Sequence, residues 1–118
     1  MYSPTQIWKY LYLIMKIQNI KGSSKVSEKP PKDYASWLDY WEKNTTFALK
    51  EGYKYKCPAC KKAFERENFD GCHVQKVDST DQKWYIIPLC DNCNHKTGTL
   101  DIGSIRMVEV PSNLEKNK

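Results

Sequence analysis

The first apolar group in the chain is a block at residues 7–17. It is shorter than the span of about 20 residues that crosses a bilayer, and it lacks the basic start and cleavage site of a signal peptide. No contact with a membrane is therefore expected. Ser3 and Pro4 are typical of a helix start ahead of this block. The alternative is that residues 1–14 are an upstream extension, because the stretch beginning at Met15 is typical of the start of a soluble protein.

A second apolar group recurs with the period of a helix. It follows residues 21–33, whose Ser, Lys and Pro content predicts a linker. Asp33 or Ser36 can cap the helix, which is expected to extend to Gly52 before a short strand leads into the first cysteine pair. Four side chains share one face of this helix and are expected to pack on the core: Tyr34, Trp37, Leu38 and Trp41. A surface on which bases stack is the alternative role of the two tryptophans.

Two further apolar runs predict a β-hairpin. Residues 71–77 and 83–88 are rich in Val, Ile and aromatic residues, and the polar residues between them favour a turn. A short helix is expected to begin near Asp91 and to end at Gly98. One more strand is expected around residues 105–110.

Four of the five cysteines form two C-x-x-C pairs, separated by 29 residues. An odd number of cysteines fits a complete set of disulfides poorly, and paired cysteines suit a metal site in a reducing compartment such as the cytoplasm. Two such pairs can bind one zinc ion in a tetrahedron. Disulfides, a redox pair or an iron–sulfur centre are the alternatives. The predicted structural zinc ligands are Cys57, Cys60, Cys90 and Cys93.

The chain length of 118 residues predicts one domain, with a modest core of the kind that often needs support from a disulfide or a metal. We assign residues 1–20 to the apolar N-terminal segment, 34–110 to the domain and 111–118 to a polar tail. A net charge of +5 mildly favours a polyanionic partner. A solvated surface is the simpler interpretation of the lysines, whereas phosphate contacts are the functional one. The lysines in question are Lys54, Lys56, Lys61, Lys62 and Lys96.

A zinc knuckle, a hairpin and a helix with the second cysteine pair make a treble-clef arrangement. The predicted fold is thus α+β, a small zinc-stabilised treble clef preceded by an amphipathic helix. Three stretches carry a family resemblance: "CPAC", "GCHV" and "IIPLCDNCNHKTG". Over about residues 55–100 the chain resembles the HNH endonucleases that hold zinc in a variant of the ββα-metal motif.

The resemblance implies a metal-dependent endonuclease that hydrolyses phosphodiester bonds in DNA, so the expected partner is a nucleic acid. His73 matches the general base, and a neutral imidazole can take a proton from water near pH 7. Mg²⁺ or another divalent cation, separate from the zinc, would stabilise charge on the phosphate. Asn94 matches the position of a ligand to that cation, with His95 as its neighbour in reserve. Asp70 would reach the site only if the strand bulged around Gly71.

Two residues depart from the family pattern. Cys72 replaces the acidic residue or histidine that usually precedes the base, and a thiol is a poor ligand for a hard cation. Tyr85 stands where the family has its middle asparagine. The alternative is therefore a treble-clef zinc module that has lost catalysis and binds nucleic acid or protein. For Cys72 the simplest role is that of a small buried apolar residue, and for His95 that of a surface helix residue.

Overall fold

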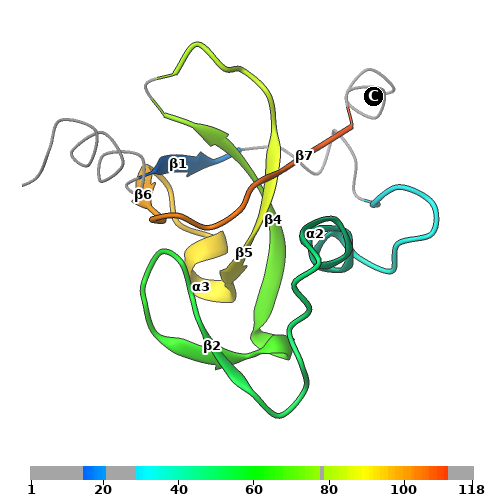
Figure 1. The fold of residues 1–118 in the computed structure, drawn as a ribbon. Helices are drawn as coiled ribbons and strands as arrows, with labels where there is room; N and C mark the ends of the chain where they lie inside the picture. The colour runs from blue at the N-terminus through cyan, green and yellow to red at the C-terminus, as the bar shows by residue number, and fades with distance from the viewer. Residues whose placement is uncertain (1–14, 21–28, 78, 112–118) are drawn as a thin grey trace, which may run out of the picture.

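A five-stranded antiparallel sheet forms the centre of the computed structural model, which describes residues 15–20, 29–77 and 79–111 (Figure 1). Its spatial order is β6-β1-β4-β5-β7. The predicted hairpin is present as β4 and β5, which pair from Phe69↔Cys90 to Val74↔Tyr85. The strands are β1 (Lys16–Asn19), β4 (Phe69–Lys76), β5 (Tyr85–Cys90), β6 (Thr99–Asp101) and β7 (Val108–Glu109).

Strand β1 comes from a part of the sequence that lies before the predicted linker. It pairs with β4 on one side and with β6 on the other, and the side chain of Ile17 is fully buried. The sheet therefore includes a strand outside residues 34–110. The helix predicted from Ser3 and the upstream extension at residues 1–14 fall outside the residues that the structure describes, as does most of the predicted linker.

Helix α2 (Trp37–Thr45) is the predicted amphipathic helix. Its cap is Ser36, whose hydroxyl accepts a hydrogen bond from the Asp39 amide at 3.0 Å. The helix does not continue to Gly52 as predicted. Thr46 adopts a left-handed conformation with φ 57°, and the amide of Leu49 turns back to the Glu42 carboxylate at 2.6 Å. This bond holds the chain in a loop at the point where the helical pattern would have continued.

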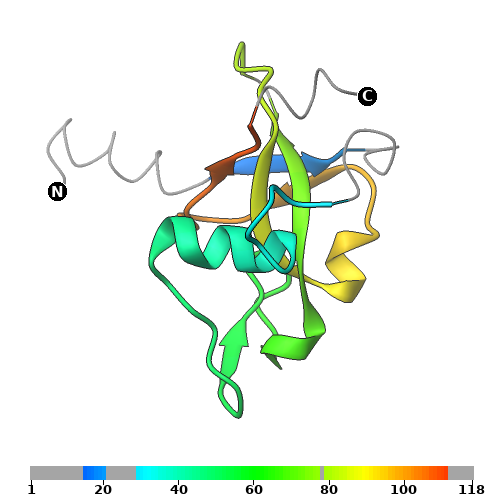
Figure 2. The same cartoon turned by 90° about the vertical axis from the view of Figure 1, so that its right-hand side faces the viewer.

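Gly71 allows α2 to lie unusually close to β4. A Cβ atom at this position would come within 2.4 Å of the Leu38 amide nitrogen and of the Trp37 carbonyl carbon. Side chains of α2 also bind the far edge of the sheet, because the Tyr40 hydroxyl donates to the Glu109 carbonyl at 2.8 Å. Figure 2 shows α2 running across the hairpin.

A second, two-stranded sheet follows the helix. It consists of β2 (Lys54–Lys56), the short strand expected before the first cysteine pair, and β3 (Ala63–Glu65). A 3-10 helix, η2 (Arg66–Asn68), leads from β3 into β4. After β5, helix α3 (Asp91–Asn94) ends before the predicted Gly98, and β6 begins directly after Gly98. Strand β7 lies within the predicted range, whereas β6 was not predicted.

The hairpin β4–β5 is buried on both faces. On one face, Ile86 packs in a cluster with Trp37 and Trp41 of α2. On the other face, Val74 and Ile87 pack with Ile17 and with residues around the cysteines. Alternate residues of a strand point to opposite faces, so neighbouring residues of β4 lie in two different environments. Neither α2 nor α3, the α-helices of the described ranges, has the length and hydropathy needed to cross a membrane.

Candidate metal centre

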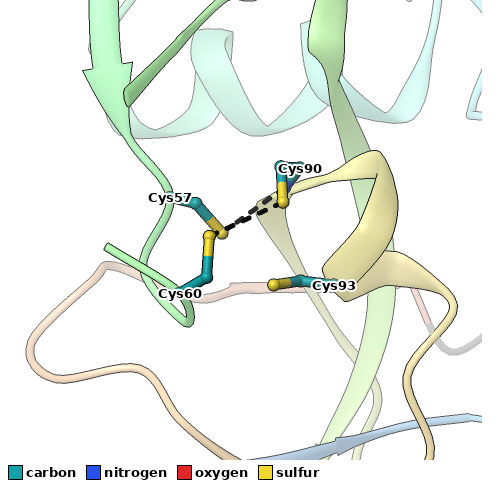
Figure 3. A group of neighbouring side chains, drawn as sticks. All are labelled: Cys57, Cys60, Cys90 and Cys93. Atoms are coloured by element: carbon teal, nitrogen blue, oxygen red, sulfur yellow. Dashed lines mark hydrogen bonds between the residues drawn. The ribbon is translucent and has the colours of Figure 1, made fainter. Parts of the chain in front are cut away.

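The four cysteines of the two C-x-x-C pairs converge at one end of the sheet. Cys57 and Cys60 come from the turn between β2 and β3, Cys90 ends β5, and Cys93 lies in α3. Their sulfur atoms all lie within 4.8 Å of one another, and Figure 3 shows them pointing toward a common centre. In the part of the chain that the structure describes, they form the one group of three or more His, Cys, Asp or Glu side chains that converges in this way.

Backbone hydrogen bonds shape the turn that carries the first pair. The Cys57 amide donates to the Lys62 carbonyl at 2.8 Å, and the Lys61 amide donates to the Cys57 carbonyl at 2.9 Å. Lys61 adopts φ 67°, and its ammonium group donates to the carbonyl of Pro58. From the second pair, the Cys90 amide points at the Cys57 sulfur, 3.5 Å away. Both pairs are thus positioned by the backbone as well as by side-chain packing.

The thiols of Cys57, Cys90 and Cys93 differ in how readily they ionise. Burial opposes ionisation of Cys57, but the amides of Cys90, Cys60 and Ala59 outweigh it and lower its pKa to about 7. Burial and the neighbouring thiols raise the pKa of Cys93 to about 12, and burial also raises the pKa of Cys90. Cys57 therefore ionises most readily of these three, and its negative charge opposes ionisation of the neighbouring thiols. A cation at the centre would remove this repulsion, because it is attracted to every thiolate.

The spacing of the sulfurs fits a metal ion better than a disulfide. The sulfurs of Cys60 and Cys90 are 3.8 Å apart, whereas a disulfide bond is about 2.05 Å long. Four sulfurs bound tetrahedrally at about 2.3 Å would lie about 3.8 Å from one another. All five cysteines of the chain are free thiols. The cluster can therefore hold a metal ion, and its donors are of the soft kind that zinc and iron–sulfur centres use.

Cys72, the fifth cysteine, is separate from this cluster. Its side chain is 2% exposed on β4, opposite Ile87, and its thiol donates to the carbonyl of Asp70 at 3.4 Å. Burial raises its pKa well above the ordinary value, so it stays a neutral thiol. Its position matches the prediction of a small buried apolar residue.

His73 lies beneath helix α2. Its ring packs edge-on against Trp37, with centroids 4.8 Å apart, and against Trp84 at 6.2 Å. Its Nε2 atom is buried and has no hydrogen-bond partner within the described ranges. Burial lowers the pKa of His73 to about 4, so the imidazole is neutral at pH 7. It has the protonation state of a general base, but the aromatic rings cover it.

Asp70 and Asn94 lie together on the opposite face of β4 from His73. The Asn94 amide donates to the Asp70 carboxylate at 3.4 Å. No bulge is needed, because β4 pairs regularly through Gly71↔Pro88. Burial raises the pKa of Asp70, and the charge of Asp91 raises it further. Regular alternation brings Asp70 to Asn94 and places His73 on the other face of β4, so Asp70 does not reach His73 in this structure.

His95 lies at the outer surface just after α3. Its side chain is 72% exposed, and its Nδ1 atom contacts the carbonyl of Asp91 at 2.8 Å. This position matches the simpler interpretation of a surface residue. Of the three predicted cation ligands, Asp70 and Asn94 are thus in contact with each other, whereas His95 contacts Asp91 instead.

The predicted phosphate-binding lysines fall in two places. Lys54 and Lys56 lie on β2, and Lys61 and Lys62 lie in the β2–β3 turn, so these four surround the first cysteine pair. Lys96 follows α3. All five side chains are exposed. Exposure permits phosphate contact and equally permits solvation, so the role of these lysines stays a prediction.

Asn19 contributes to this end of the molecule and was not predicted from the sequence. Its amide donates to the carbonyls of Cys93 and Lys96, at 3.0 and 2.9 Å. It therefore links β1 to the end of α3, where the Cys93 carbonyl also accepts a hydrogen bond from the Lys96 amide at 3.2 Å. The available signal was the alternation around Ile17, which marks a strand, but no pattern in the sequence indicated where that strand pairs.

No family model matches this chain, and neither does any curated protein or solved structure. The resemblance to HNH endonucleases therefore stays a prediction from the motif residues.

Proposed function

We propose that Cys57, Cys60, Cys90 and Cys93 bind one structural zinc ion, and that the resulting treble clef is a nucleic-acid-binding module of HNH type. The observation that carries the proposal is the convergence of four sulfurs from two separate segments within 4.8 Å. A zinc ion would join the β2–β3 turn to α3 more firmly than the hydrogen bond from the Cys90 amide to the Cys57 sulfur does.

The nucleic-acid part of the proposal is supported by the position of the lysines. The turn that the zinc would fix also carries Lys61 and Lys62, and β2 presents Lys54 and Lys56. Fixing the turn would hold four positive charges in a constant arrangement. Such an arrangement binds phosphates independently of base sequence and weakens as salt rises.

The first experiment measures zinc by elemental analysis of freshly purified protein, and binding to a labelled oligonucleotide by fluorescence anisotropy. We expect one zinc per chain, and we expect Cys60→Ser to lose both zinc and binding. Cys72→Ala is the matched control, because it removes a buried thiol that lies outside the cluster. Zinc loss in Cys72→Ala, with zinc retained in Cys60→Ser, would reject the assignment of the ligands.

A metal-dependent nuclease is the second candidate function, and the contact between Asp70 and Asn94 favours it. Their side-chain oxygens are donors that suit a hard cation such as Mg²⁺, which would stabilise negative charge on a phosphate. The resemblance to HNH endonucleases implies that His73 activates the attacking water. Its ring lies under Trp37 and on the other face of β4, so α2 would have to move before His73 reached that site. For this reason the binding module is the first proposal.

A plasmid-nicking assay with Mg²⁺, Mn²⁺ or Ni²⁺ tests the second candidate. A nuclease would nick DNA, and His73→Ala and Asp70→Asn would each abolish nicking while zinc stays bound. Equal nicking by the wild type and both variants would reject these residues as catalytic. Absence of nicking in every metal, with zinc and DNA binding retained, would support the binding module.

A further inference from the structure

A cavity of about 530 Å³ opens between the end of α2, the metal-binding turn and residues 102–106. Its volume lies in the range of small-molecule sites. We propose that this cavity binds an unstacked base of a single-stranded nucleic acid together with the phosphates next to it. The proposal rests on the proposed function and specifies its substrate class as single strands.

The wall of the cavity carries an exposed aromatic ring in a fixed position. Phe47 is 51% exposed, yet its ring packs edge-on against Trp41 and Tyr55, with centroids 6.1 Å away in each case. Ile105 adds apolar surface beside it. An aromatic ring that is held by its neighbours and open to solvent is a platform on which a base can stack. A smaller cavity of about 200 Å³ also has Phe47 in its lining, so the apolar surface continues beyond the first one.

The rim of the cavity is positively charged. Lys56, Lys61 and Arg106 line it, and none of its lining residues, all of them in the described part of the chain, is acidic. Arg106 is held in place, because its guanidinium donates to the Thr45 carbonyl at 3.3 Å. Three cations around an apolar pocket match a ligand with a flat aromatic part and adjoining negative charges. A base with its flanking phosphates has this composition, and in a duplex the base would be stacked and out of reach.

The test compares fluorescein-labelled dT12, U12 and a 12-base-pair DNA duplex by fluorescence anisotropy. We expect one or both single strands to bind more tightly than the duplex, and the ratio of dT12 to U12 affinity to show whether DNA or RNA is preferred. Phe47→Ala should weaken single-strand binding about tenfold, the order of one lost stacking contact. Tyr53→Ala is the matched control, because Tyr53 is 63% exposed but lies outside the cavity. Its affinity should stay within about twofold of the wild type.

The charge of the rim is tested with Lys56→Gln. We expect weaker binding and a slope of log affinity against log salt that is smaller by about one. Lys61 is unsuitable for this test because it has positive φ and its ammonium group binds within the metal-binding turn. Lys32→Gln is the control, because Lys32 is exposed and does not line the cavity.

The two proposals fail in different ways. Binding that is unaffected by Phe47→Ala, or that is as tight for the duplex as for both single strands, would overturn the cavity proposal and leave nucleic-acid binding intact. A peptide would then be the better candidate ligand for the apolar surface of the cavity. Absence of binding to all three probes by the zinc-loaded wild type would overturn the nucleic-acid function itself.

Discussion

The imidazole of His73 lies edge-on against the indole of Trp37, with ring centroids 4.8 Å apart and an interplanar angle of 77°. This contact places an ionisable group between the sheet and α2, where water reaches it poorly. Burial lowers the pKa of His73 to about 4, from an ordinary value of 6.5. The titration of His73 therefore reports whether α2 covers the hairpin in solution.

We expect the ¹H–¹³C signals of the His73 ring to stay constant from pH 8 to pH 5. The spectrum of His95→Gln assigns the two histidines. Because the folded-state pKa is below the unfolded-state value, stability is complete above pH 6.5 and falls as the pH drops toward 4. After allowing for the partial exposure of the ring, the loss should be about 2 kcal/mol. A midpoint near 6.5 for His73 would show that the ring is solvated and that α2 lies elsewhere.

Gly71→Ala should destabilise the fold by about 3 kcal/mol, the upper end of the cost of overpacking. The new Cβ atom would lie 2.4 Å from backbone atoms of Trp37 and Leu38, and backbone moves less readily than a side-chain tip. Urea unfolding monitored by circular dichroism measures the change. Gly52→Ala is the control for backbone strain alone: Gly52 has φ 82° and no atoms within 4 Å of a new Cβ, so about 1 kcal/mol is expected. Equal effects would contradict the close approach of α2.

Glu42→Ala should lower the free energy of unfolding by about 3 kcal/mol. The Glu42 carboxylate is 7% exposed, pairs with the Arg66 guanidinium at 2.7 Å and accepts a hydrogen bond from the Leu49 amide at 2.6 Å. Glu42→Ala leaves both donors without their partner. Lys43→Ala removes a neighbouring but 59% exposed member of an ion pair with Asp39, so less than about 0.5 kcal/mol is expected. Thermal unfolding of the two variants side by side tests the difference.

Chelation of the proposed zinc should abolish cooperative unfolding. Zinc contributes on the order of 10–16 kcal/mol to the folding of small zinc-finger peptides, which exceeds the stability of most domains of this size. Without the ion, the negative charge of a Cys57 thiolate would lie beside the buried thiols of Cys90 and Cys93 with no cation to balance it. Far-UV circular dichroism during titration with a chelator and back-titration with Zn²⁺ measures the effect. A sharp, unchanged melting transition in metal-free protein would exclude a structural role for the ion.

Local patterns predicted the elements whose partners are near in sequence. The apolar period around Trp37 and Trp41 marked α2, and the alternation on both sides of a polar turn marked β4 and β5. The paired spacing of the cysteines predicted their convergence, because a metal site needs four donors and these were the obvious four. In each case the physical cause is local or is fixed by ligand chemistry.

Contacts between distant segments could not be predicted in the same way. Strand β1 pairs with residues more than 50 positions away, and nothing in its four residues specifies those partners. The relation of His73 to Asp70 depended on which face of β4 meets α2, and that is set by Gly71 and by tertiary packing. The cavity around Phe47 brings α2 together with residues 102–106, which no sequence motif connects.

The two hydrogen bonds of Asn19 connect strand β1 to the end of the molecule that carries the cysteine cluster. They join β1 to the carbonyls of Cys93 and Lys96, directly beside a sulfur of the cluster. A fragment that starts at residue 29 would expose the edge of β4 and release the end of α3, although every cysteine would still be present. Binding of the proposed ion would thus depend on the assembled sheet, and removal of β1 should weaken it although β1 carries no cysteine.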